Sequence, residues 1–139
     1  MLPVLVRAPF AAALAASILL VAAGCGDSSG RETASVDGIE QTLADLEEAL
    51  SERDSGRICD RIFSPEARRR AGGEECRRRL KRTTEALDSP SLELVSVTLG
   101  AGSAVAQVRA DAGDAPPAID SMRFVPIEGV YRVDSLSGG

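Results

Sequence analysis

The chain has 139 residues, a formal net charge of −5 and no histidine or tryptophan. This length suits one small domain rather than several. Without histidine, the chain lacks the side chain that most often serves as a metal ligand and as a general base. Its acidic balance argues against a nucleic-acid-binding protein.

The first 24 residues are organised like a secretory signal peptide. One basic residue, Arg7, precedes an uncharged apolar run over residues 8–23. Because this run is shorter than the ~20 apolar residues of a comfortable bilayer span, it favours a signal peptide over a permanent membrane helix. The run ends in Ala22-Ala23-Gly24-Cys25, which resembles the processing site of bacterial lipoproteins. That pattern usually has leucine where this chain has Ala22, so ordinary secretion is the alternative.

The lipoprotein resemblance implies that Cys25 carries a lipid and is the first residue of the mature protein. Acyl chains on Cys25 would hold the protein on the membrane, facing outside the cytoplasm. The following residues are small and polar, as in a flexible tether. We therefore expect a signal peptide over residues 1–24, the lipidated cysteine and tether over residues 25–37, and one domain over residues 38–137.

An amphipathic pattern opens the expected domain. Apolar residues recur at the spacing of one helical face, at Ile39, Leu43, Leu46 and Leu50. Asp37, with Glu40 three residues later, resembles a capping box and is expected to begin the helix. Gly56 is expected to end it, near residues 53–56.

Shorter helical segments follow. The first is expected to place four apolar residues on one side, namely Ile58, Cys59, Ile62 and Phe63. Ser64 and Pro65 have the composition of a helix start, and the Gly72-Gly73 pair should end that helix soon afterwards. A longer helix is expected over residues 74–87, with an inner stripe of Cys76, Leu80, Thr83 or Thr84, and Leu87.

The three cysteines are expected to have two different roles. If Cys25 carries a lipid, Cys59 and Cys76 remain, and an even pair outside the cytoplasm favours a disulfide. Both lie on the apolar sides of their expected helices, with a short turn-rich connection between them. Closing a loop of this length contributes about 3 kcal/mol in the chain-entropy model. A metal site or a catalytic cysteine is the weaker alternative, because both usually require histidine.

The pattern changes to strands after Pro90. Four segments are expected to be strands joined by turns, over residues 92–99, 104–110, 121–127 and 130–136. Val95, Val97 and Leu99 are expected to share one face of the first strand. Pro126 should lie at an edge or at a strand end, because proline donates no ladder hydrogen bond. Helices followed by an antiparallel meander predict an α+β layer fold.

This order of elements has a family resemblance. The Cys59-bearing helix, the helix start at Ser64–Arg68 and the closing run Tyr131–Leu136 resemble small actinobacterial lipoproteins, which are similar to the nuclear-transport-factor-2-like (cystatin-like) superfamily. The resemblance spans roughly residues 36–136. It implies N-terminal helices packed on a curved antiparallel sheet of about four strands, shaped like a cone. Enzymes of that superfamily commonly use an Asp–His pair, which a chain without histidine does not supply.

An arginine cluster is the main candidate for a binding site. Ten basic and four acidic residues lie between Arg57 and Arg82, whereas the rest of the expected mature chain is acidic. Guanidinium groups match phosphate and carboxylate, so the cluster is a candidate patch for anionic lipid or cell-wall polymer. The simpler interpretation is a solvated helix face. The candidate residues are Arg68, Arg69, Arg70, Arg77, Arg78, Arg79 and Arg82.

We expect no catalytic residue, no metal site and no cofactor. Asp120, Tyr131 and Asp134 lie on strands, where a carboxylate paired with Arg123 or Arg132 usually forms a cross-strand surface pair. The sequence therefore predicts a non-catalytic, lipid-anchored extracytoplasmic domain that binds a ligand or partner at the cell envelope. The alternative is a small-molecule carrier or small enzyme that uses the cone interior. The protein partner is not identified by the sequence, and nucleic acid is not expected.

Overall fold

The structure is a computed structural model that describes residues 35–137, to which all structural statements refer. The expected signal peptide, Cys25 and most of the expected tether lie outside the described residues. The helical elements are α1 (Val36–Ser51), α2 (Ser55–Arg57), the π-helix η1 (Ile58–Ile62), α3 (Pro65–Arg70), the 3₁₀ helix η2 (Gly73–Glu75) and α4 (Cys76–Thr84). The strands are β1 (Ser91–Gly100), β2 (Ser103–Asp111), β3 (Ala118–Ile127) and β4 (Val130–Ser137).

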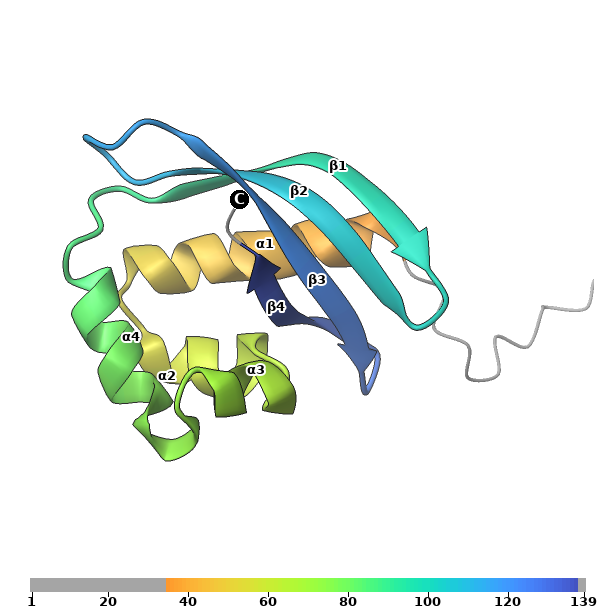
Figure 1. The fold of residues 1–139 in the computed structure, drawn as a ribbon, viewed down its shortest axis with the longest axis horizontal. Helices are drawn as coiled ribbons and strands as arrows, with labels where there is room; N and C mark the ends of the chain where they lie inside the picture. Colours follow the sequence, from red (N-terminus) through yellow and green to blue (C-terminus); the bar gives the residue numbers. More distant parts are fainter. Residues whose placement is uncertain (1–34, 138–139) are drawn as a thin grey trace, which may run out of the picture.

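The four strands form one antiparallel sheet in the order β1-β2-β3-β4. Helix α1 lies across one face of the curved sheet and contacts β1 and β4 (Figure 1). The shorter helices α2, α3 and α4 lie together on the other side of α1 from β1 and β2. This arrangement confirms the predicted α+β fold with helices packed on a four-stranded antiparallel sheet. None of the helices in residues 35–137 is both long and apolar enough to cross a bilayer.

The core lies between α1 and the sheet. Helix α1 contributes Ile39, Leu43, Leu46 and Ala49, each at most 5% exposed. Leu50, expected on this stripe, is only half-buried, and Ala49 takes the inner position instead. The sheet presents small residues on β2 and larger ones on β3 and β4, so the two layers fit closely around Phe124. The sheet residues of the core are Ala104, Ala106, Val108, Met122, Phe124, Tyr131 and Val133.

A β-bulge changes the inner face of β1. The pairing with β2 shifts between Leu94 and Ser96, which leaves Val95 without a partner. Val95 is 48% exposed, whereas Leu92, Leu94 and Val97 pack against the core. The prediction that Val95 shares a face with Val97 is therefore wrong, because the extra residue reverses the alternation along the strand.

Helix α1 begins earlier than predicted. The Ser35 side-chain oxygen accepts a hydrogen bond from the Gly38 backbone N–H at 3.1 Å, so Ser35 is the N-cap. Asp37 lies inside the first turn, where its negative charge interacts favourably with the helix dipole. The predicted cap at Asp37 is therefore wrong. The helix therefore includes Val36 and Asp37, which the sequence placed in the tether.

The predicted helix end at Gly56 is also wrong. Helix α1 ends at Ser51, and Arg53 adopts a left-handed backbone conformation with φ of 57°. The Asp54 carboxylate then accepts the Arg57 backbone N–H at 2.9 Å and caps α2. Gly56 lies within α2, so a side-chain cap, rather than a glycine, separates the two helices.

The remaining helix starts agree more closely with the sequence. The Ser64 hydroxyl caps α3 as predicted, and Gly72, with φ of 112°, follows its end. Helix α4 is shorter than predicted and ends at Thr84 rather than Leu87. Thr84 is the buried member of the inner stripe, and Thr83 is exposed. Pro126 lies near the end of β3, as predicted.

Candidate functional site

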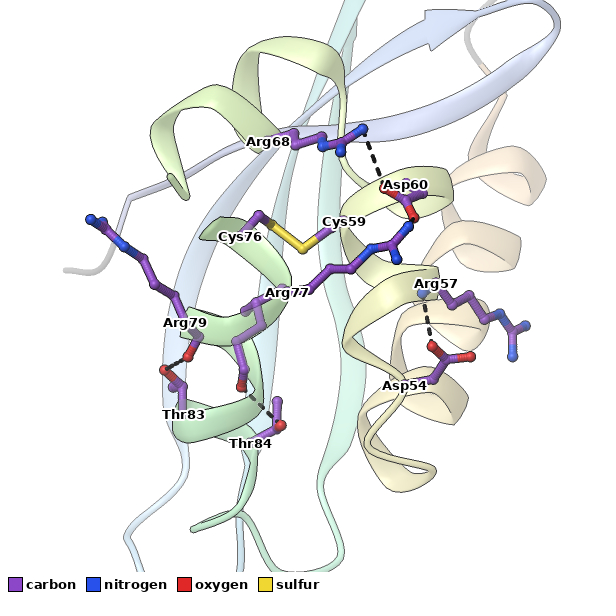
Figure 2. Close-up of a disulfide and its surroundings, with 11 residues drawn as sticks. Asp54, Arg57, Cys59, Asp60, Arg68, Cys76, Arg77, Arg79, Thr83 and Thr84 are labelled. Carbon is purple, nitrogen blue, oxygen red and sulfur yellow. Dashed lines mark hydrogen bonds and ion pairs between the residues drawn. A yellow bond between two sulfur atoms is a disulfide. The ribbon is translucent and has the colours of Figure 1, made fainter. Parts of the chain in front are cut away.

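A disulfide holds the shorter helices together. Cys59 of η1 and Cys76 of α4 are bonded, with their Cα atoms 6.2 Å apart, as the sequence predicts (Figure 2). Both side chains are at most 1% exposed. The bridge closes a separation of 17 residues that contains α3 and η2, so it fixes the ends of this segment relative to each other.

The chain after Cys59 runs from a π-helix into an extended segment. The Phe63 N–H donates to the Ile58 carbonyl at 2.8 Å, and Phe63 itself is extended. Phe63 forms a parallel bridge with Val133, and the Ser64 N–H donates to the Val133 carbonyl at 2.8 Å. Since π-helical turns are uncommon and often occur at functional sites, this segment is a natural place to look for one. It brings residue 60 close to β4.

Asp60 is the centre of a charge cluster next to the disulfide. Arg68 of α3 and Arg77 of α4 both reach its carboxylate, from different sides (Figure 2). Arg68 Nη1 lies 3.2 Å from Asp60 Oδ1, yet this oxygen accepts no aligned hydrogen bond. Arg132 Nη1 of β4 donates to the Asp60 backbone carbonyl at 3.4 Å. Three separate elements therefore converge on one residue of η1.

An open hollow of about 680 Å³ adjoins this cluster. Its apolar lining comes from Cys59, Phe63 and Pro65. Its charged lining consists of three arginines and two carboxylates, namely Arg68, Arg69, Arg132, Asp60 and Glu74. The Arg132 Nε is buried and has no acceptor within the described residues. A hollow with both apolar and guanidinium lining has the chemistry to hold an organic anion.

The structure separates the seven predicted arginines into groups. Arg68 and Arg77 meet at Asp60. Three others pair with nearby carboxylates: Arg69 with Glu66, Arg70 with Glu66 and Asp134, and Arg78 with Glu75. Neither Arg79 nor Arg82 forms an ion pair with a residue in the described range. Of the seven, only Arg68 and Arg69 line the hollow.

Sequence reasoning missed Arg132 as a site residue. Arg132 was expected to form a cross-strand surface pair, but its guanidinium donates to the Asp60 backbone carbonyl, 72 residues earlier in the chain. No local pattern indicates this contact, because it depends on the Phe63–Ser64 segment lying along the edge of β4.

Arg57 belongs to a separate network that joins α2 to α1. Its guanidinium lies 2.7 Å from Glu48, 3.5 Å from Asp45 and 3.6 Å from Glu52. The hydrogen bond to Glu48, supported by the negative charges of the three carboxylates, raises the pKa of Arg57 above its ordinary value. Arg57 therefore stays charged and links the two helices.

The other titratable candidates have structural partners or lie apart. The extra residue of a bulge in β4, Asp134, accepts the Ser64 hydroxyl at 2.8 Å and lies near Arg70. Asp120 pairs with Val108 across β2 and β3. Tyr131 packs its ring on Gly38, and its buried hydroxyl has no hydrogen-bond partner among the described residues. Within residues 35–137, no three potential metal ligands of the His, Cys, Asp or Glu types lie together.

Comparison with solved structures identifies the fold. The chain is similar to a designed protein of the nuclear-transport-factor-2-like type, Rd1NTF2_05 with five substitutions, at 17% identity and a TM-score of 0.61. This match covers 74% of the chain and 97% of the designed protein. TsrD from Streptomyces laurentii is similar at 16% identity and a TM-score of 0.49, over 75% of this chain and 91% of TsrD.

The first of these matches shows a nuclear-transport-factor-2-like fold, and its identity is too low to say anything of function. No protein-family model and no curated protein matches the chain. Function must therefore be argued from the residues themselves.

Proposed function

We propose that the protein is a non-catalytic, lipid-anchored extracytoplasmic domain that binds a ligand or partner at the cell envelope. The Cys59–Cys76 disulfide is the observation that carries this proposal. Disulfides form and persist mainly in oxidising compartments outside the cytoplasm. Such a compartment is also the destination implied by the apolar N-terminal run and by Cys25.

Binding is favoured over catalysis by the state of the charged side chains. At the hollow, Asp60 already interacts with Arg68 and Arg77. On β4, Asp134 is engaged by Ser64 and Arg70. A general base needs an acceptor that reaches the substrate, whereas these carboxylates hold elements of the protein together.

A carrier that uses the cone interior is the second candidate. The observation in its favour is the buried Tyr131 hydroxyl, which has no partner among residues 35–137. Tyr131 also lines a hollow of about 320 Å³ between the start of α1 and the β3–β4 turn. A ligand acceptor at this place would satisfy that donor. The tightly packed residues between α1 and the sheet argue against a large ligand there.

Anchoring is tested by metabolic labelling with an alkyne fatty acid in a bacterial host that processes lipoproteins. We expect the wild-type protein to incorporate the label and to fractionate with membranes. The Cys25→Ser variant should lose the label, since its side chain carries no sulfur to accept the lipid. The matched control is Ser28→Ala in the neighbouring tether, which should be labelled like the wild type. An unlabelled wild-type protein in the cytoplasmic fraction would overturn the proposal.

A further inference from the structure

We infer that the hollow beside the disulfide binds an anionic group, phosphate or carboxylate, that carries an apolar portion. This inference rests on the proposed function and names the ligand class of that binding domain. The hollow is lined by residues of η1, α3, η2 and β4 and by Phe63.

Unused hydrogen-bond donors are the first support. A guanidinium group carries five N–H donors. Within residues 35–137, the two guanidinium groups of Arg68 and Arg132 together make a single hydrogen bond, from Arg132 Nη1 to the Asp60 carbonyl at 3.4 Å. Arg132 Nε is buried and has no acceptor there, and a buried donor without an acceptor is unfavourable, so an added anion would stabilise it. The Arg68 side chain is 42% exposed and has only the misaligned ion pair with Asp60 Oδ1, so its other donors are open to a ligand.

The origin of the arginines is the second support. A solvated helix face explains arginines that follow one another along a helix. It does not explain why Arg132, from the last strand, lines the same hollow as Arg68 and Arg69 of α3. The position of Arg132 is set by the pairing of the Phe63–Ser64 segment with β4. The fold itself therefore brings these guanidinium groups together.

The lining indicates what kind of anion fits. Cys59, Phe63 and Pro65 give the hollow an apolar part, and its volume of about 680 Å³ is far larger than an inorganic phosphate needs. Pockets of ~300–1,000 Å³ with mostly apolar lining and a few polar groups are typical of small organic ligands. An anion with an attached apolar group should therefore bind better than either part alone.

Asp60 and Glu74 reduce the net positive charge of the hollow. Both carboxylates line the hollow and partly neutralise its arginines. Asp60 also attracts Arg77 from the far side. An incoming anion would compete with Asp60 for Arg68. Because salt screens the attraction between exposed charges, increasing ionic strength should weaken binding of the anionic probe.

The test uses the full chain and three probes that separate the contribution of the charge from that of the apolar group. Phenyl phosphate has both parts, inorganic phosphate has only the charge, and benzyl alcohol has only the apolar ring. Isothermal titration calorimetry should give phenyl phosphate an affinity at least about tenfold higher than either other probe, because charge-assisted bonds and apolar burial act together. Absence of phenyl phosphate binding would overturn the inference.

Variants locate the binding. Arg68→Met and Arg132→Met keep much of the apolar length and remove the donors, so each should lower the affinity for phenyl phosphate about tenfold or more. The matched control is Arg82→Met on α4, which removes the same charge outside the hollow and should change the affinity less than about twofold. Equal losses in all three variants would refute the site. Thermal unfolding checks that each variant is folded. If Arg132→Met does not fold, the affinity of Arg68→Met alone tests the site.

The source of the anion is distinguished by a membrane arm. If Arg68→Met also weakens binding to phosphatidylglycerol nanodiscs but not to phosphatidylcholine nanodiscs, the anion is a lipid headgroup. If phenyl phosphate binding falls and nanodisc binding does not, the anion is a soluble ligand. Both results support the site. Failure of the site would leave the fatty-acid labelling of Cys25 unchanged, so it is distinguishable from failure of the proposed function.

Discussion

Ser64 and Asp134 join the start of α3 to the bulge of β4 through one hydroxyl group. The Ser64 hydroxyl donates to Asp134 Oδ1 at 2.8 Å and accepts from the Ala67 backbone N–H at 3.0 Å. Ser64 is 1% exposed, so water does not readily replace these bonds. One side chain thus ends the extended segment, caps the helix and fixes the helix to the sheet edge.

Replacing Ser64 with alanine should therefore destabilise the fold strongly for a one-atom change. Loss of an N-cap costs about 0.5–2 kcal/mol, and loss of a hydrogen bond to a carboxylate adds to it. We expect a decrease of about 2 kcal/mol in the free energy of unfolding, measured by urea denaturation. Ser51→Ala is the matched control, since the Ser51 hydroxyl is exposed and bonds only within α1. A similar small effect for both variants would contradict the structural role of Ser64.

Removing the disulfide is a second test. For the separation of 17 residues between Cys59 and Cys76, the chain-entropy model gives a contribution of about 3 kcal/mol. The double variant Cys59→Ala/Cys76→Ala should have a free energy of unfolding lower by about 3 kcal/mol, and so a lower urea midpoint, with little change in the folded spectrum. Adding reductant during unfolding should affect the wild type and not the double variant. Equal urea midpoints for the two proteins would count against the bridge.

Gly38→Ala should be destabilising although alanine favours helices. An added Cβ at Gly38 would lie 2.8 Å from Cδ2 of the buried Tyr131 ring, so the ring or α1 must shift. Such overpacking costs about 1–3 kcal/mol, against about 1 kcal/mol gained from helix propensity. Gly56→Ala is the matched control, because its nearest neighbour would be Asp54 Oδ1 at 3.4 Å. Thermal unfolding should show a lower midpoint for Gly38→Ala and an unchanged or higher midpoint for Gly56→Ala.

Tyr131→Phe should leave stability unchanged or increase it by up to about 1 kcal/mol. The hydroxyl is buried without a partner among residues 35–137, so its removal ends a desolvation penalty and breaks no hydrogen bond there. Thr42→Val is the control variant, because the Thr42 hydroxyl donates to the backbone carbonyl of Tyr131. Its hydroxyl lies 2.8 Å from the Tyr131 carbonyl and 3.0 Å from the Gly38 carbonyl, so its loss should cost about 1 kcal/mol. Urea denaturation in which Tyr131→Phe loses as much stability as Thr42→Val would reveal a partner for the hydroxyl.

Local patterns predicted the helices and strands well, because the signals lie within a few residues. The spacing of Ile39, Leu43 and Leu46 fixes the buried face of α1, and Ser64 followed by Pro65 marks the start of α3. The start of α1 was harder to predict. Both Ser35 and Asp37 are good N-cap residues, and the choice between them depends on where the chain enters the helix.

Features set by strand pairing were not readable from the sequence. Val95 and Val97 are chemically identical, so alternation alone gives no sign of the bulge that exposes Val95. Arg132 joins the hollow through a contact to Asp60, far away in the chain. The arginine cluster was visible as a run of charge, but the carboxylate partner of each arginine, and which arginines line the hollow, depend on the folded positions of the chain.

The most direct test of the account is the intact mass of the protein isolated from membranes after thiol alkylation without reductant. The account predicts a mature chain that begins at lipidated Cys25 and carries no alkyl group on Cys59 or Cys76. A chain that keeps residues 1–24, has no lipid and takes up alkyl groups on Cys59 and Cys76 would contradict it.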